Sequence, residues 1–169
     1  MLVIVNRMRF VKLFLISVIV LFGLLTGISL LLPSHIRISR AIDISDLAPH
    51  IRQQIQDLRN WEDWNEYIKA VRLIDVSNDR IYTKDLSVLR MSLDDHGVHT
   101  RWSEPNRKAF HGVFRLIENG SVTTVQWYFD FVFRWYPWEK LSSIVYDQQL
   151  GPPMEKSLHN LKDLIEKEH

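Results

Sequence analysis

The pattern of apolar positions changes sharply along the chain, from one unbroken run near the N-terminus to periodic spacing in the remainder. Residues Leu13 to Leu32 form twenty consecutive apolar or small uncharged residues. At 1.5 Å rise per residue, a helix of this length spans about 30 Å, the thickness of a bilayer's hydrocarbon core. We therefore predict a membrane anchor, with residues 1–33 forming a cytoplasmic stub and transmembrane helix and residues 34–169 forming one folded domain.

A cleaved signal peptide is the alternative interpretation of this run. Its apolar region would be about 7 to 15 residues long and would end in a small-x-small cleavage site. The run here is longer and ends in Leu30-Leu31-Leu32-Pro33, although Gly27 and Ser29 leave cleavage open. Three basic residues precede the run (Arg7, Arg9 and Lys12), which favours a single-pass protein with its N-terminus inside and its domain on the extracytoplasmic face.

Beyond the run, the periodicity alternates between strand and helix. Isoleucines at even spacing predict a strand over His35–Ile44. Ser45-Asp46 then offers a side-chain N-cap for a helix that ends near Asn60. Its apolar stripe consists of Leu47, Ile51, Ile55 and Leu58. Shorter strand-like runs follow around Lys69–Val76 and Ile81–Thr83.

Two hairpins follow in the predicted sheet. A turn at Asn119-Gly120 would set Phe114 opposite Val125, Gly112 opposite Trp127 and Phe110 opposite Phe129, with every large apolar residue on one face. A four-residue loop over Asp94–Gly97 would pair Leu93 with Val98, Met91 with Thr100 and Leu89 with Trp102, and would bring Arg90 opposite Arg101 on the other face.

The last predicted element is a long amphipathic helix that starts after Gly151-Pro152-Pro153. Its apolar stripe consists of Met154, Leu158, Leu161 and Ile165. Such a stripe has to be buried against the apolar face of the sheet. The fold class is therefore α+β: strand, helix, antiparallel meander, and a long C-terminal helix gripped by a curved sheet.

Charge and composition exclude some functions. Three of the 21 basic residues precede the span, which leaves 18 in the domain against 20 acidic residues, a net charge of −2 with neutral histidines. This balance gives no basic patch for nucleic acid. The chain has no cysteine, and it shows no serine-elbow motif and no glycine-rich phosphate loop. We therefore expect no cofactor and find little to indicate an enzyme.

Three segments carry a family resemblance: the opening strand HIRISRAIDI, the segment Asp57–Trp64 and the segment Leu150–Lys162. They resemble the START-like superfamily, the polyketide cyclase/dehydrase and lipid-transport group with the helix-grip fold. Asp57–Trp64 is similar to the family's D-x-x-x-W-x-x-W segment, and Leu150–Lys162 resembles the start of its final helix, G-P-x-(F/M)-E-K-(G/S)-L-x-x-L-K. The resemblance covers essentially all of residues 34–169. It implies a cavity between the last helix and the sheet, used across the family for lipids, sterols, polyketides or other apolar ligands.

The chain departs from this family in two ways. The segment Phe131–Trp138 is unusually aromatic, so its own side chains can fill part of the cavity. Catalytic members also line the cavity with polar residues specific to each subgroup, and no such set is recognisable here. The resemblance therefore favours ligand binding without supplying a reaction.

The first candidate site is a set of aromatic and methionine side chains that would line an apolar pocket. Ordinary core packing beneath the helix is the alternative. The set consists of Met91, Trp102, Phe110, Phe114, Trp127, Phe129, Phe131 and Met154.

Three further groups are weaker candidates. Trp135–Lys140 could cover the cavity mouth or touch lipid headgroups, against the alternative of packing. Asp94, Asp95, His96 and His99 carry metal-binding atoms, but the same residues are good turn formers, so we predict no metal. His111 and Asp130 could form an acid–base pair, against the alternative of a surface ion pair.

These observations lead to a primary hypothesis and two alternatives. The first is a membrane-anchored domain that binds a hydrophobic small molecule or lipid without catalysis, with the membrane as its second partner through Leu13 to Leu32. The second is an interaction protein with a collapsed cavity, acting through its surface on an unknown protein partner. The third is a cyclase- or hydrolase-like enzyme.

Overall fold

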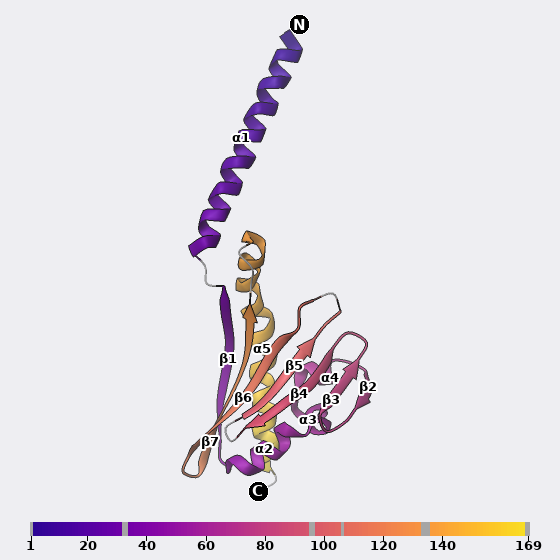
Figure 1. Ribbon diagram of the computed structural model, residues 1–169. Coiled ribbons are helices and arrows are strands. Elements are labelled where there is room, and N and C mark those ends of the chain that lie inside the picture. The colour runs from indigo at the N-terminus through magenta and orange to yellow at the C-terminus, as the bar shows by residue number, and fades with distance from the viewer. Residues whose placement is uncertain (1, 32–33, 95–96, 106, 133–135, 168–169) are drawn as a thin grey trace. The chain divides into compact units, whose positions relative to one another are not determined.

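The computed structural model describes residues 2–31, 34–94, 97–105, 107–132 and 136–167, with side chains outside 2–8, 137–138 and 140–144. Figure 1 shows the elements in chain order. They are α1 (Leu2–Leu31), β1 (His35–Ile44), α2 (Ala48–Gln56), η1 (Leu58–Asn60), α3 (Trp61–Trp64), α4 (Glu66–Lys69), β2 (Leu73–Val76), β3 (Arg80–Thr83), β4 (Ser87–Asp94), β5 (Gly97–Ser103), β6 (Phe110–Asn119), β7 (Val122–Val132) and α5 (Pro137–Lys167).

The chain divides into two compact units. One combines Met1–Ile36 with Val132–Val145, and the other combines Arg37–Phe131 with Tyr146–His169. The first unit contains α1, in which Arg9–Leu31 is one helix of 23 residues, long and apolar enough to cross a membrane. The predicted run extends to Leu32, which lies outside the described residues, as does Pro33 of the predicted hinge.

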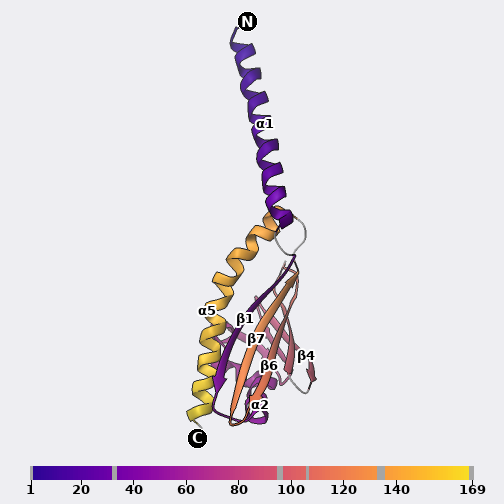
Figure 2. The same cartoon turned by 90° about the vertical axis from the view of Figure 1, so that its left-hand side faces the viewer.

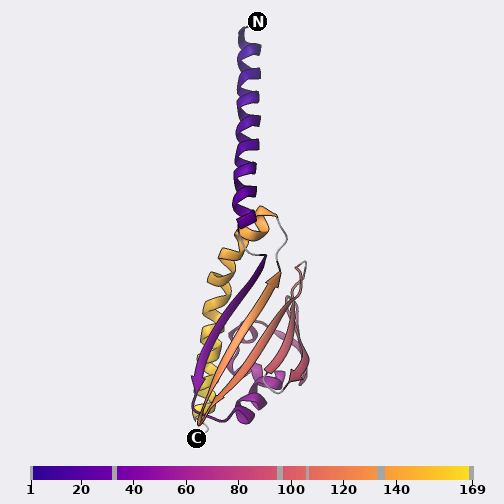
Figure 3. The same cartoon turned by 60° about the vertical axis from the view of Figure 1, so that its left-hand side comes forward.

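The sheet belongs to the second unit apart from the ends of β1 and β7. Its strand order is β1-β7-β6-β5-β4-β3-β2, and every pairing from β2 to β7 is antiparallel. Side-chain contacts show that β1 is antiparallel to β7 as well, because Arg37 meets Asp130 while Asp43 meets Thr124. Figures 2 and 3 show β1 and β7 side by side beside the yellow part of α5. The predicted antiparallel α+β architecture is confirmed.

The first strand has the predicted bounds, but the capping of the next helix was predicted wrongly. Helix α2 begins at Ala48, with Leu47 as its N-cap and Pro49 in its first turn. The Asp46 carboxylate accepts a hydrogen bond from the Leu47 backbone N–H at 2.6 Å, which fixes the chain just before the helix. Proline supplies the helical φ at this position without a cap, so the helix does not need Ser45 or Asp46.

The register of the β6–β7 hairpin was also predicted wrongly, although its face was right. Phe114 pairs with Trp127, Gly112 with Phe129 and Leu116 with Val125. Asn119 pairs with Val122, so the loop is Gly120-Ser121, with Gly120 at φ +68°. The shift is two residues along β7. Side chains alternate with period two, so this shift keeps the same residues inside and cannot be detected from periodicity alone.

In the β4–β5 hairpin, only the pair of Leu93 with Val98 was predicted correctly. A bulge between Arg90 and Ser92 leaves Met91 unpaired, so Arg90 pairs with Thr100 rather than Arg101, and Leu89 pairs with Arg101 rather than Trp102. Because a bulge inserts one extra residue into the strand, the alternation of side chains between the two faces of the sheet is shifted by one position on passing the bulge.

The C-terminal helix begins earlier than predicted. Helix α5 starts at Pro137 and contains Pro152 and Pro153 in its interior, whereas the sequence predicts that the helix begins at these prolines. The predicted apolar stripe is nevertheless correct, since its four members are at most 1% exposed: Met154, Leu158, Leu161 and Ile165. These residues face the sheet, and Figure 2 shows the yellow part of α5 running along one side of it.

Candidate functional site

The predicted aromatic set forms one cluster, and most of it is closed to solvent. Trp102, Phe114, Trp127, Phe129 and Met154 are at most 1% exposed, and Phe131 is 8% exposed. Trp127 stacks on Phe114 with ring centroids 4.7 Å apart, and it contacts Phe129 edge-on at 5.1 Å. These side chains pack against one another and fill the space between the sheet and the helices.

One member of the set lies elsewhere, and another is only half-buried. Phe110 is half-buried at the rim of the cluster, with ring centroids 5.0 Å from Phe131, 5.2 Å from Phe129 and 6.2 Å from Trp102. Met91 is 55% exposed at the β4 bulge, not on the buried face where the predicted pairing placed it. None of the eight predicted residues lines the pocket described next, so their contact with a ligand stays a prediction.

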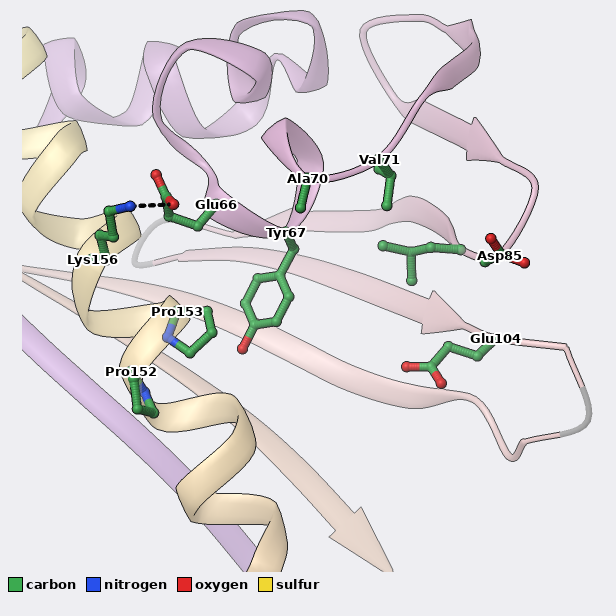
Figure 4. Close-up of a pocket in the computed structure, with 10 residues that line it drawn as sticks. Glu66, Tyr67, Ala70, Val71, Asp85, Glu104, Pro152, Pro153 and Lys156 are labelled. Carbon is green, nitrogen blue, oxygen red and sulfur yellow. Dashed lines mark ion pairs between the residues drawn. The ribbon is translucent and has the colours of Figure 1, made fainter.

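A pocket of about 670 Å³ lies at the edge of this cluster. Figure 4 shows its lining: α4 and the residues after it, the β3–β4 turn, the residue after β5, and one turn of α5. Most of the wall is apolar, contributed by Tyr67, Ala70, Val71, Leu86, Pro152 and Pro153. The remaining lining residues are charged: Glu66, Asp85, Glu104 and Lys156.

Tyr67 connects the pocket to the aromatic cluster. Its ring meets Trp102 and Trp127 edge-on, with centroids 5.7 and 5.9 Å away. Its hydroxyl donates a hydrogen bond to the backbone carbonyl of Leu150 in α5, at 2.7 Å. Burial raises the pKa of the Tyr67 phenol far above its ordinary value, because the charged phenolate would lose its hydration. The hydroxyl therefore remains protonated and holds α4 against α5.

At one end of the pocket, Glu66 is held by α5. Its carboxylate accepts from Lys156 Nζ at 2.8 Å and from Asn160 Nδ2 at 2.7 Å. Its backbone N–H donates to Ser157 Oγ at 2.9 Å. These hydrogen bonds, that from Lys156 most strongly, lower the pKa of Glu66 by stabilising its charged form.

Asp85 and Glu104 lie at the other end of the pocket (Figure 4). Ser87 and Ser103 form the last pair of the β4–β5 ladder, with Asp85 two residues before Ser87 and Glu104 directly after Ser103. Glu104 accepts from Arg107 Nη1 at 2.8 Å. Asp85 has no side-chain partner within the described part of the chain, although its backbone N–H donates to Thr83 Oγ1.

The weaker predicted sites have different outcomes. No group of three or more metal-binding side chains occurs among the described residues, and Asp95 and His96 lie outside them. Asp94 instead pairs with His99 at 2.7 Å. For the proposed lid, residues 133–135 and the Trp138 side chain lie outside the description, so it stays a prediction.

His111 lies directly opposite Asp130 in the β6–β7 ladder, whereas the predicted register made the two residues diagonal neighbours. Arg37 binds Asp130 through two hydrogen bonds of 2.7 and 2.9 Å, and its guanidinium lies 3.9 Å from the centre of the Tyr128 ring. The Arg37–Asp130 ion pair therefore joins β1 to β7 on the outer face of the sheet, and neither residue lines the pocket.

Solved structures with the same arrangement are found among proteins of low sequence identity. A START superfamily protein from Mycobacterium smegmatis matches 79% of this chain and 99% of its own, with a TM-score of 0.58 at 14% identity. The fold is START-like. Norcoclaurine synthase from Thalictrum flavum, solved with dopamine and hydroxybenzaldehyde, matches 80% of this chain and 88% of its own, with a TM-score of 0.60 at 8% identity.

A Staphylococcus aureus protein of unknown function shares this START-like fold, with a TM-score of 0.61 at 12% identity over 79% of this chain and 95% of its own. No protein-family profile and no curated protein matches the chain by sequence. At these identities the likeness extends to the fold, and the chemistry of the site has to be argued from this chain's own residues.

Sequence reasoning missed the residues that line the pocket. Pro152 and Pro153 were interpreted only as the start of a helix, and Asp85 and Glu104 belong to loops without periodicity. The one available signal was Tyr67, which closes the aromatic segment after α2 and has a polar tip that needs a partner when buried.

Proposed function

We propose that this chain is a membrane-tethered START-like domain that binds an apolar small molecule or lipid without transforming it. One observation carries the proposal: the pocket of about 670 Å³ beside Tyr67, with a mostly apolar wall. Small-molecule sites are typically mostly apolar cavities of about 300–1,000 Å³ with a few polar groups that orient the ligand.

The titratable groups of the pocket support binding rather than catalysis. A general acid or base works best with a pKa near the working pH. Here the pKa of Glu66 is lowered and that of Tyr67 is raised, so both move away from neutrality. Both side chains are also committed to contacts with α5, which holds the wall of the pocket in place.

The tether completes the proposal. Helix α1 contains one segment, Arg9–Leu31, that is long and apolar enough to cross a membrane. A domain attached to such a helix remains close to the bilayer, where lipids and other apolar molecules are concentrated. We propose the orientation with the N-terminus inside and the domain outside, from the basic residues that precede the span.

The decisive experiment is native mass spectrometry of the full chain purified in detergent. We expect a co-purified adduct of a few hundred daltons. A70W places a large ring in the pocket from an exposed position, so we expect it to abolish the adduct with little effect on folding. Q53W, at an exposed position of α2 away from the pocket, should retain it. An adduct unchanged by A70W would place the ligand elsewhere.

A second candidate function has its own support. The aromatic cluster fills the interior between sheet and α5, which favours a domain that acts through its surface on a protein partner. The same experiment separates the two functions. Wild-type protein that carries no adduct, and takes up none when incubated with a lipid extract, would favour the surface function.

A further inference from the structure

We propose that the ligand of this pocket is an amphiphile with a cationic amine head as well as an apolar body. This inference rests on the proposed function, because it names the chemical class of that same ligand. It follows from the charges of the lining, which holds three carboxylates and one ammonium, and that ammonium is paired with Glu66.

The donors of the pocket are already committed. The Tyr67 hydroxyl donates its hydrogen bond to the Leu150 carbonyl, which leaves only the lone pairs of the hydroxyl oxygen for a ligand. The Lys156 ammonium binds the Glu66 carboxylate at 2.8 Å. Tyr67 therefore offers a ligand no hydrogen-bond donor, and the positive charge of Lys156 is balanced by Glu66.

The prolines of α5 add acceptors near the same wall. Pro152 and Pro153 line the pocket within the helix and have no backbone N–H. The carbonyls of Gln148 and Gln149, four residues earlier, therefore cannot receive the usual helical hydrogen bond. These two acceptors lie one turn before the prolines in α5, although Gln148 and Gln149 are not themselves lining residues.

The opposite end of the pocket carries negative charge. Asp85 has no side-chain partner among the described residues, and the Glu104 carboxylate is paired with Arg107 at 2.8 Å. Figure 4 shows both residues at the end of the pocket away from the Glu66–Lys156 pair. The pocket lining as a whole holds three carboxylates and one ammonium.

This arrangement discriminates between head groups. A protonated amine donates hydrogen bonds and is attracted to the Asp85 end, while its apolar body covers Val71, Leu86 and the proline rings. The face of an aromatic ring such as Tyr67 also attracts cations. A fatty acid would bring a third carboxylate to an end of the pocket that already holds Asp85 and Glu104, and the repulsion between like charges would disfavour its binding.

Calorimetric titration of the full chain in phosphatidylcholine nanodiscs, at pH 7 and with empty discs as the blank, tests the inference. The probes are octylamine, 1-octanol and octanoate, which share one chain length. We expect the dissociation constant for octylamine to be at least about fivefold lower than for 1-octanol, and octanoate to bind weakest. D85N should remove most of the amine preference and leave 1-octanol binding unchanged. E118Q removes an equal charge at an exposed position of β6 and should behave as wild type.

The outcomes separate the inference from the proposed function. Equal binding of amine and alcohol, a preference for octanoate, or equal effects of D85N and E118Q would overturn the cationic ligand while the apolar pocket stands. If none of the three probes binds the wild-type protein, the proposed function fails and this inference fails with it.

Discussion

At Gly112, a missing side chain makes room for the packed core. A Cβ atom at this position would lie 2.8 Å from Phe129 Cε1, from Thr100 Oγ1 and from Trp102 Nε1. The sequence indicated that this glycine makes room for an aromatic ring across the hairpin. The ring is that of Phe129, its true partner, and of Trp102 on the neighbouring strand, rather than that of Trp127.

G112A tests this close approach. All three neighbouring atoms belong to buried side chains that cannot move without displacing others, so the extra methyl group overpacks the core. We expect the free energy of unfolding to fall by about 1–3 kcal/mol, measured by denaturant titration of the detergent-purified chain. S121A, in the exposed hairpin loop, serves as the control. A free energy of unfolding equal to that of the wild type in G112A would show that the core can accommodate a methyl group at this position.

Between elements, the contact of α4 with α5 shapes the pocket wall. Glu66 of α4 binds Lys156 and Asn160 of α5, while Tyr67 binds the Leu150 carbonyl one turn away from the prolines. Short helices of four residues have little stability of their own. These side-chain contacts therefore determine where α4 lies against α5.

E66Q gives this contact a pH signature. The pKa of Glu66 in the folded chain is lowered from its ordinary value of 4.5. Its charged form therefore stabilises the fold above about that pH, and the contribution is lost as the pH falls through the lower folded value. We expect E66Q to lower the melting temperature by about 2 °C at pH 7, and we expect this effect to shrink steadily as the pH falls below 4.5.

The matched control is E62Q, an exposed carboxylate on α3. It should leave the melting temperature unchanged at pH 7 and at pH 3. An effect of E66Q that is equally large at pH 3 would mean that the side chain matters for its shape rather than its charge.

At the scale of the whole molecule, the question is which side of a membrane each end of the chain occupies. The chain contains no cysteine, so a single introduced thiol reports its own location without background. We expect D163C, exposed on α5, to react with a membrane-impermeant maleimide in intact cells, and V3C to react only after permeabilisation. The reverse labelling pattern would show the opposite orientation in the membrane. Recovery of the protein in the soluble fraction would contradict the prediction of a membrane anchor.

The sequence by itself determined which face of β1, β6, β7 and α5 is buried. The even spacing in β1, the stripe of α5 and the one-sided β6–β7 hairpin follow from local periodicity, since burial repeats every two residues in a strand and about every 3.6 in a helix. In β4 the bulge breaks this rule, and Leu89, Met91 and Leu93 are exposed. Leu158 and Phe114 could be assigned to the core for this reason, and the segment Arg9–Leu31 could be recognised by its length and composition.

Only the tertiary structure decided the strand registers and the pocket. A shift of two residues in β7 preserves every inside–outside assignment, so the choice between Val125 and Trp127 as partner of Phe114 depends on how the rings pack in three dimensions. The pocket joins Tyr67, Asp85, Glu104 and Pro153, which are far apart along the chain. No local pattern links such residues, because their proximity is created by the packing of α4 and α5 around the end of the sheet.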